Sequence, residues 1–448
     1  NQTKIYVTGE KILKNNKYEI DMCNGSIMDK LISFALPLML SGILQLMFNA
    51  VDIVVVGRFS GSQALAAVGS TTALINVFTN LFIGISLGAN VLAARYYAAG
   101  KTKEMSETVH TAIALALVSG VAMAVIGVVF ARGALEIMGT PDDVIAKSTL
   151  YMRIYFCGMP FFMMYNYGAA ILRAVGDTKR PLIFLIVSGV INAVLNLFLV
   201  IGFHLDVAGV GIATVISQLV SCILVLRCLH HTESSYQLHL AKLRIRSVYL
   251  KQIFEVGVPA GIQSTVINIS NAMLQSSVNS FGSIAMAGYT ASNNIFGFLY
   301  VSVNSFTQAC MSFTSQNYGV KKLKRMDRVL IDCMILSVVV TLILGSSVYI
   351  FGPELLHIYS NQADVIKYGM EIFSYTTVTY FLCGLMDLFP GALRGMGYST
   401  VPMILSIIGT VGVRIIWIYG LFPSHRSLTF LFLSYPVSWI ATIIMQVI

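Results

Sequence analysis

Charged side chains are scarce in this chain. Only 11% of its 448 residues are Asp, Glu, Lys or Arg, whereas 56% are hydrophobic. A soluble globular protein carries roughly 25% charged residues, so this chain has too little charge to solvate several separate cores. The same composition excludes intrinsic disorder, a collagen repeat and a disulfide scaffold. The composition therefore predicts a chain whose surface lies mostly in lipid.

The sequence also lacks the usual signatures of catalysis. Six of its seven cysteines lie inside apolar runs, only Cys23 lies in a polar one, and none has the spacing of a zinc site. Gly84-Ile85-Ser86-Leu87-Gly88 resembles a hydrolase nucleophile elbow, but it lies inside a long apolar run and indicates close helix packing instead. We expect no enzyme activity and no bound cofactor.

Long apolar runs occupy most of the chain. A helix that crosses a bilayer needs about 20 apolar residues at a rise of 1.5 Å each. Backbone hydrogen bonding in lipid leaves helices as the sensible interpretation of such runs. The sequence predicts an all-α polytopic membrane protein with twelve transmembrane helices. The runs lie near residues 31–56, 65–94, 109–131, 148–171, 181–202, 208–228, 252–278, 284–316, 328–351, 367–391, 401–421 and 427–448.

Basic residues cluster in alternate breaks between these runs. If the N-terminus lies inside the cell, 22 Lys and Arg fall in inner segments and 5 in outer loops. This asymmetry predicts that both termini are cytoplasmic. It also explains the formal charge of +9 without nucleic-acid binding. The polar first 30 residues do not resemble a cleaved signal peptide, and the whole pattern favours a multi-pass protein of a bacterial inner (plasma) membrane.

The second half of the chain repeats the first at a shift of 221 residues. The segment 172–176 (LRAVG), followed by Pro181, matches the segment 393–397 (LRGMG), followed by Pro402. Each half has six predicted helices, an even number, so both halves share one orientation. Such parallel repeats are typical of secondary transporters, which bind substrate between the halves. The predicted parts are a cytoplasmic segment 1–30, a six-helix lobe 31–228, a cytoplasmic linker 229–251 and a second six-helix lobe 252–448.

Several short segments of the chain form a recognisable set. They are Pro37 with Asp52, Arg95-Tyr96-Tyr97, residues 172–178, Asn192 with Asn196, residues 209–214 and residues 316–319. Together they resemble the multidrug and toxic compound extrusion (MATE) family of antiporters, over nearly the whole chain from about residue 28. The resemblance implies two six-helix lobes in a V, alternating access, and export of organic, often cationic, compounds in exchange for Na⁺ or H⁺.

Asp52 is the first candidate for cation coupling. An ionised carboxylate inside an apolar run costs at least ~2.5 kcal/mol, so it must be protonated, ion-bound or paired. At 1.5 Å per residue, Asn192, Asn196 and Thr214 reach a similar depth, and the two asparagines share one helix face. Asp52, Asn192 and Thr214 could together hold a hard cation such as Na⁺. The resemblance implies the same: the matching positions form the family's N-terminal cation site.

One position departs from the family pattern. The residue that matches Asn196 is commonly Asp in the family, so this chain offers one carboxylate where relatives offer two. Fewer negative charges hold Na⁺ less tightly, and the coupling ion, H⁺ or Na⁺, stays open. The two asparagines are also explained by interhelical hydrogen bonding alone.

The second lobe carries its own polar candidates. Asp387 has Asn166 as its counterpart in the repeat, so the lobes differ chemically. Asp387 is explained equally by an ion pair with Arg414 and by a role in substrate or proton binding. Arg414 lies near mid-membrane and must pair or face water. The candidates for a substrate cavity or for the second lobe are Asp387, Arg414, Asn268, Tyr289 and Tyr165.

The leading hypothesis is a cation-coupled antiporter, embedded in the lipid bilayer as a monomer, that exports small organic, cationic or amphipathic compounds. A flippase-like exporter of a lipid-linked or anionic substrate shares the same predicted fold and would want a basic central cavity. A membrane enzyme and a channel are weaker alternatives, because no catalytic cluster appears and twin repeats favour a rocking carrier.

Overall fold

The computed structural model describes residues 18–448; the first 17 residues, most of the predicted segment 1–30, lie outside the described part. The described residues form helices joined by short connections. The first half contains α1 (Met28–Phe59), α2 (Ser62–Ala98), α3 (Thr102–Ile137), α4 (Asp142–Cys157), α5 (Met159–Ala174), α6 (Lys179–Leu197) with the π-helical η1 (Phe198–Gly202), and α7 (Asp206–His230).

The second half repeats this order with more interruptions. It contains α8 (Ser247–Asn279), α9 (Ser283–Gly319), α10 (Leu323–Ile350), α11 (Gly352–His357), α12 (Ala363–Thr376), α13 (Tyr380–Gly395), α14 (Thr400–Ser406), η3 (Ile407–Gly412), α15 (Val413–Ile416), η4 (Trp417–Leu421), α16 (Leu428–Phe432) and α17 (Ser434–Val447). A 3-10 turn, η2 (Leu240–Lys242), lies in the connection between the halves.

Each predicted transmembrane run coincides with one helix or with consecutive helical segments, such as α14, η3, α15 and η4 for the run 401–421, and the architecture is the twelve-helix membrane fold. By length and composition alone, eight helices of the described chain can cross a membrane, or nine if the pair α12 and α13, bent by 52°, is one span. The remaining runs are broken, like α4 and α5 with 16 residues each, or rich in amides and hydroxyls, like α8 and α9.

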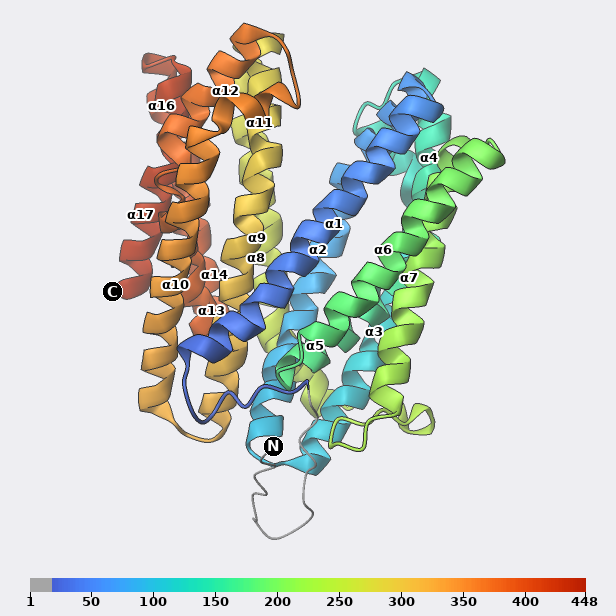
Figure 1. Cartoon of the computed structure of the whole chain (residues 1–448), viewed down its shortest axis with the longest axis vertical. Helices are drawn as coiled ribbons and strands as arrows, with labels where there is room; N and C mark the ends of the chain where they lie inside the picture. The colour runs from blue at the N-terminus through green and yellow to red at the C-terminus, as the bar shows by residue number, and fades with distance from the viewer. Residues whose placement is uncertain (1–17) are drawn as a thin grey trace.

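Figure 1 shows two helix bundles that diverge toward the top and meet in the lower half, where α1 begins. Helices α2 to α7 form one bundle and α9 to α17 form most of the other. The first helix crosses between them. Phe34, near its start, packs edge-on against Phe313 of α9 with ring centroids 5.6 Å apart, whereas Val56, near its end, lies in the core of the first bundle. The α1 helix thus links both lobes.

The α8 helix crosses in the opposite sense. Its early residue Ile253 lies in the core of the first bundle, and its late residues Leu274 and Val278 lie in a core of the second. The repeat therefore places the first helix of each half partly on the other half. In both helices a proline, Pro37 or Pro259, lies about three turns from the start, where its missing N–H weakens the backbone ladder.

Glycines let α2 and α8 touch where the lobes meet. Gly84 and Gly88 of α2 face Gly257 and Gly261 of α8, and a Cβ on any of the four would collide with backbone atoms of the opposite helix. Small residues spaced by four on both helices permit such close backbone approach in a membrane. The structure confirms that Gly84 and Gly88 serve helix packing.

Candidate functional site

Four polar side chains from three helices form one hydrogen-bonded cluster in the first lobe. The Asn196 amide of α6 donates to Asp52 Oδ1 of α1 and to Asn192 Oδ1, the latter at 3.2 Å. Asn192 donates to Thr214 Oγ1 of α7 at 3.5 Å, and the Thr214 hydroxyl donates to the backbone oxygen of Val210 at 2.9 Å. All four residues that the sequence placed at similar depth are therefore brought together.

Local helix geometry explains this convergence. Asn192 and Asn196 are four residues apart on α6, so both point to the same side, toward α1 and α7. Both asparagines are buried, Asn196 completely, while Asp52 is half-buried. Just beyond Asn196 the chain widens into the π-helical turns of η1, a feature that is frequent at functional sites.

The cluster contains one oxygen with nothing to bond. Asn196 Oδ1 is buried and has no hydrogen-bond donor among the described residues, although a buried amide oxygen without a partner costs about 1–3 kcal/mol. A carboxylate, two amide oxygens and a hydroxyl are hard oxygen ligands that suit Na⁺. The described residues include no group of three His, Cys, Asp or Glu that would hold a transition metal. The arrangement can therefore accept a proton on Asp52 or an alkali cation.

Two tyrosines beside this cluster were not predicted from the sequence. Tyr151 and Tyr155 of α4 lie near enough to Asp52 for its charge to act on their hydroxyl groups. Both rings extend the buried core of this lobe, Tyr151 within it and Tyr155 packed against it. Their spacing of four residues on α4 places them on one face, and this spacing is the only signal that the sequence offered.

In the second lobe, the sequence left two interpretations of Asp387 open, and the ion pair with Arg414 is the one that the described residues contradict. No ion pair of Asp387 occurs among the described residues, and the cation that acts on it electrostatically is Arg394. Asp387 and Arg394 lie seven residues apart on α13, which is two helical turns on the same face. Arg394 itself is buried and donates to Gln263 Oε1 of α8 at 2.5 Å.

Arg414 instead has neutral partners. Its Nη1 donates to Asn271 Oδ1 at 2.8 Å, its Nε donates to Ser438 Oγ at 3.3 Å, and its guanidinium carbon lies 4.7 Å from the ring centroid of Tyr435. The helices joined are α15, α8 and α17. Only 3% of Arg414 is exposed, so it lies inside the second lobe and not on an open basic surface.

The other predicted candidates do not gather around one site. Tyr289 is buried, stacks on Phe432, and shares a 2.9 Å hydrogen bond with the Tyr435 hydroxyl. Tyr165 is half-buried and donates to the backbone oxygen of Pro181 at 3.1 Å, joining α5 to α6. Asn268 lies exposed on α8. These residues lie in three different places.

The comparison with known proteins agrees with the repeat. The MatE family model matches twice, over residues 37–198 and again over 259–419. The chain belongs to the MATE family. The protein described as "Probable multidrug resistance protein YoeA" of Bacillus subtilis (strain 168) is 30% identical over 389 residues, which cover 85% of this chain and 84% of that protein. The "Multidrug export protein MepA" of Staphylococcus saprophyticus is 23% identical over 404 residues, covering 89% and 88% of the two chains.

Solved MATE structures share the same fold. An outward-facing multidrug resistance MATE transporter superposes with a TM-score of 0.87 at 19% identity, covering 97% of this chain and 96% of that one. A transporter of the same superfamily from Pyrococcus furiosus, described as having a binding pocket of reverse polarity, also gives 0.87, at 20% identity and 95% coverage of both chains. This MATE chain is therefore a multi-pass membrane transporter of the multidrug efflux type.

Proposed function

We propose that this MATE protein is an antiporter that exports small organic, cationic or amphipathic compounds while H⁺ or Na⁺ moves the other way. The observation that carries the proposal is the bond between Asp52 and Asn196. It joins the far half of α1 to α6 within the first lobe, while the near half of the same helix packs on the second lobe. A cation that changes this bond changes how the two lobes are linked.

Protonation would act through hydrogen-bond chemistry. An ionised Asp52 only accepts hydrogen bonds, and here it accepts one from the Asn196 amide. A protonated Asp52 has an O–H to donate, which the Asn196 amide nitrogen cannot accept. Rotation of that amide would present Oδ1, the oxygen that now lacks a donor. Each protonation state of Asp52 therefore favours a different arrangement between α1 and α6.

Sodium would act at the same oxygens. It would bind the Asp52 carboxylate together with the amide oxygens of Asn192 and Asn196 and the hydroxyl of Thr214. Inward movement of one positive charge across 100 mV supplies ~2.3 kcal/mol for export of a neutral compound. One-for-one exchange with a monovalent organic cation moves no net charge, so the H⁺ or Na⁺ concentration gradient alone drives it. The rocking of the lobes about their glycine-lined contact would then expose the substrate to the opposite side.

The chemistry of the second lobe supports an organic cation better than an anion. The alternative flippase-like exporter needs a free basic group in the centre, yet Arg414 is enclosed by Asn271, Ser438 and Tyr435. Asp387 is half-buried beside Tyr300, an exposed tyrosine. A carboxylate next to an exposed aromatic ring suits an amphipathic cation through charge and cation–π attraction.

The test is transport by the purified protein in liposomes. Ethidium movement would be measured under an imposed H⁺ gradient and, separately, under an imposed Na⁺ gradient. We expect one of the two gradients to drive ethidium against its own concentration gradient. Ethidium that moves under neither gradient, although the protein is folded, would contradict the proposal, and transport of an anionic dye in its place would favour the flippase-like alternative.

A further inference from the structure

The two lobes carry equivalent gaps at the end of the molecule where α1 begins, and the chain fills only one of them. Each gap lies between the start of the first helix of a lobe and a turn with a left-handed glycine. These glycines are Gly176, with φ +93°, and Gly397, with φ +97°, which are equivalent in the 221-residue repeat. Lys30 of α1 lies seven residues before Pro37, and Lys251 of α8 lies eight residues before Pro259, the matching proline of the repeat.

In the first lobe the gap is closed by the segment before α1. Backbone atoms of Ile20 lie so close to Gly176 that a Cβ there would meet Ile20 N at 2.7 Å. The Lys30 ammonium donates to the backbone oxygens of Asp21 at 2.5 Å and Asn24 at 2.6 Å. The segment before α1 therefore covers Gly176 and provides hydrogen-bond acceptors for Lys30.

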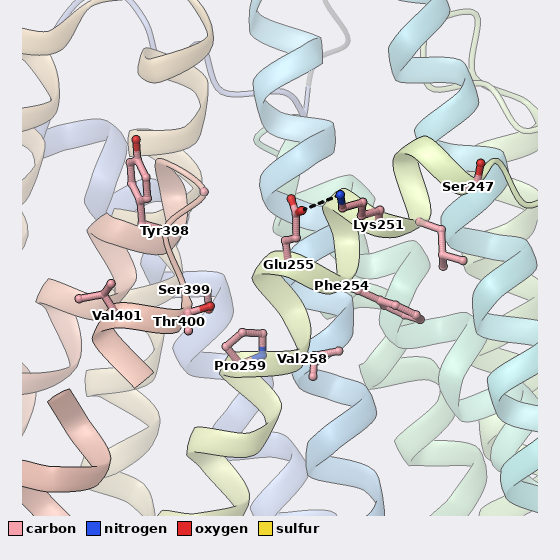
Figure 2. Close-up of a pocket in the computed structure, with 12 residues that line it drawn as sticks. Ser247, Lys251, Phe254, Glu255, Val258, Pro259, Tyr398, Ser399, Thr400 and Val401 are labelled. Carbon is pink, nitrogen blue, oxygen red and sulfur yellow. Dashed lines mark ion pairs between the residues drawn. The ribbon is translucent and has the colours of Figure 1, made fainter. Parts of the chain in front are cut away.

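In the second lobe the equivalent segment goes elsewhere. The residues before α8 run along α3 of the first lobe, where Arg246 pairs with Glu107 at 3.2 Å and its backbone N–H donates to Thr111 at 3.3 Å. The space beside Gly397 stays open as a pocket of about 710 Å³. Figure 2 shows side chains of α8 on one side of this pocket and those of the turn before α14 on the other.

The pocket has an apolar wall and a charged rim. Phe254, Tyr398 and Val401 line it and are respectively 36%, 60% and 59% exposed. At the rim, Lys251 and Glu255 form a loose pair at 3.9 Å, with 77% and 57% of their side chains exposed. Such an exposed pair contributes little stability, so a ligand can separate it at little cost.

Unsatisfied polar groups lie at the base of the pocket. Ser399 lines it and is 2% exposed, and its Oγ has no hydrogen-bond partner among the described residues. Beneath Gly397 lies the guanidinium of Arg95, whose Nη2 would be 2.8 Å from a Cβ at that glycine. The Nε and Nη2 of Arg95 are buried and likewise have no hydrogen-bond partner in the described chain, and the guanidinium carbon lies 4.9 Å from the ring centroid of Tyr318. Lys251, Glu255 and Arg95 together leave a net positive charge.

We propose that this pocket binds one phospholipid with a primary ammonium headgroup, such as phosphatidylethanolamine, from the adjoining leaflet. The phosphate would accept hydrogen bonds from Lys251 and Ser399, near the positive charge of Arg95. The ammonium would donate to Glu255, and the acyl chains would lie along Phe254 and Val401. The lipid thus takes the place that residues 20–24 hold in the first lobe, beside Pro259, where α8 is weakened.

Native mass spectrometry of the purified full-length protein tests this site without any transport assay. The protein would be titrated in detergent with phosphatidylethanolamine or phosphatidylglycerol of identical acyl chains. We expect one tight site that prefers the ethanolamine lipid by about fivefold. This is the effect of one exposed charge pair, here between the lipid ammonium and Glu255. Equal binding of the two lipids by the unaltered protein would overturn the assignment of the headgroup.

Substitutions locate the site. Val401→Trp fills the pocket from an exposed position and should abolish tight binding, while Lys251→Ala should weaken it about fivefold. Glu255→Gln should remove the preference for ethanolamine but keep binding of the glycerol lipid. Lys103→Ala, an exposed lysine at the start of α3, is the matched control and should change nothing. Tight binding that survives Val401→Trp and Lys251→Ala in folded protein would overturn the proposal.

Discussion

The Asn196 amide donates a hydrogen bond to the Asp52 carboxylate, across the boundary between α6 and α1. Asn196 is fully buried, yet its own amide oxygen has no donor among the described residues. An ionised Asp52 thus has a hydrogen-bond donor, whereas the amide oxygen of Asn196 has none among the described residues. A site with one spare oxygen beside a carboxylate is suited to exchange a cation.

Substitutions at Asn196 should separate its charge-related role from its packing role. Asn196→Leu keeps the approximate size but removes the amide, and a hydrogen bond to a charged group is worth about 1.5–3 kcal/mol. We therefore expect coupled transport to fall by roughly 10- to 100-fold. Asn196→Asp adds a second carboxylate and should increase the affinity for Na⁺.

The measurement for both variants is the concentration of the driving cation that gives half-maximal ethidium transport in liposomes. Val190→Leu serves as the comparison, because Val190 lies exposed on the same helix and outside the polar cluster. Identical cation dependence in all three variants would show that Asn196 only packs.

The contact between α2 and α8 should not tolerate one added methyl group. In Gly88→Ala the new Cβ would collide with backbone of Ile253, and such overpacking costs about 1–3 kcal/mol. Gly133→Ala in α3 is the matched control, because a Cβ there meets nothing within 4 Å. Thermal unfolding in detergent should show a lower Tm for Gly88→Ala and an equal or higher Tm for Gly133→Ala. Equal values for the two variants would contradict close packing at this contact.

Removing a hydrogen-bond partner of Arg414 should lower the free energy of unfolding, whereas replacing Arg414 itself should change it little. Asn271→Leu deletes the acceptor of the 2.8 Å bond from Nη1 and leaves a buried charge with less compensation, at a cost of about 1.5–3 kcal/mol. Arg414→Met replaces the buried charge with an apolar chain of similar length, which is often neutral or stabilising by about 1–4 kcal/mol. Unfolding in detergent should rank Asn271→Leu as the least stable. The reverse order would show that Arg414 stabilises the lobe.

Cys23 reports whether the segment before α1 stays in place. Burial, with a further contribution from Asp21, raises the pKa of its thiol to about 11, and its Sγ lies 3.9 Å from Gln316 Oε1. The thiolate is the form that reacts with maleimide. Below pH 9 the thiolate fraction of Cys23 is smaller than that of a free cysteine. Labelling of Cys23 at pH 8 should therefore be roughly 100-fold slower than labelling of a free cysteine. The rate should keep rising with pH until about pH 11.

The control for this labelling is Ser26→Cys, an exposed position of the same segment, in protein whose other cysteines are replaced. It should react at the rate of a free thiol. Equally fast labelling at both positions would mean that the segment does not remain packed against α9.

The depth of polar residues was predictable from the sequence, and their rotation about the helix axis was not. Asp52, Asn192 and Thr214 were placed at one level because each helix enters the membrane at a recognisable residue and rises uniformly. Asp387 and Arg414 also lie in adjacent helices, but their side chains point to different neighbours, Arg394 and Asn271. Only the packed structure sets that direction.

The path of the connecting segments could not be predicted from the sequence either. The repeat predicted that residues near Gly176 and Gly397 are equivalent, but not that one connection folds back onto its glycine while the other follows α3. Such differences depend on a few hydrogen bonds, such as those of Lys30 and Arg246. Apolar periodicity carries no information about them.

The most direct test of the central claim compares gradient-driven transport with simple exchange in the same liposomes. Asp52→Asn cannot bind a proton or ionise, so ethidium should no longer accumulate under an H⁺ or Na⁺ gradient, while exchange of labelled for unlabelled ethidium continues. Asp387→Asn, at the carboxylate proposed to attract the organic cation, should raise the ethidium concentration needed for transport but keep accumulation dependent on the imposed gradient. Undiminished accumulation by Asp52→Asn would contradict the account, because the cation would then be coupled elsewhere.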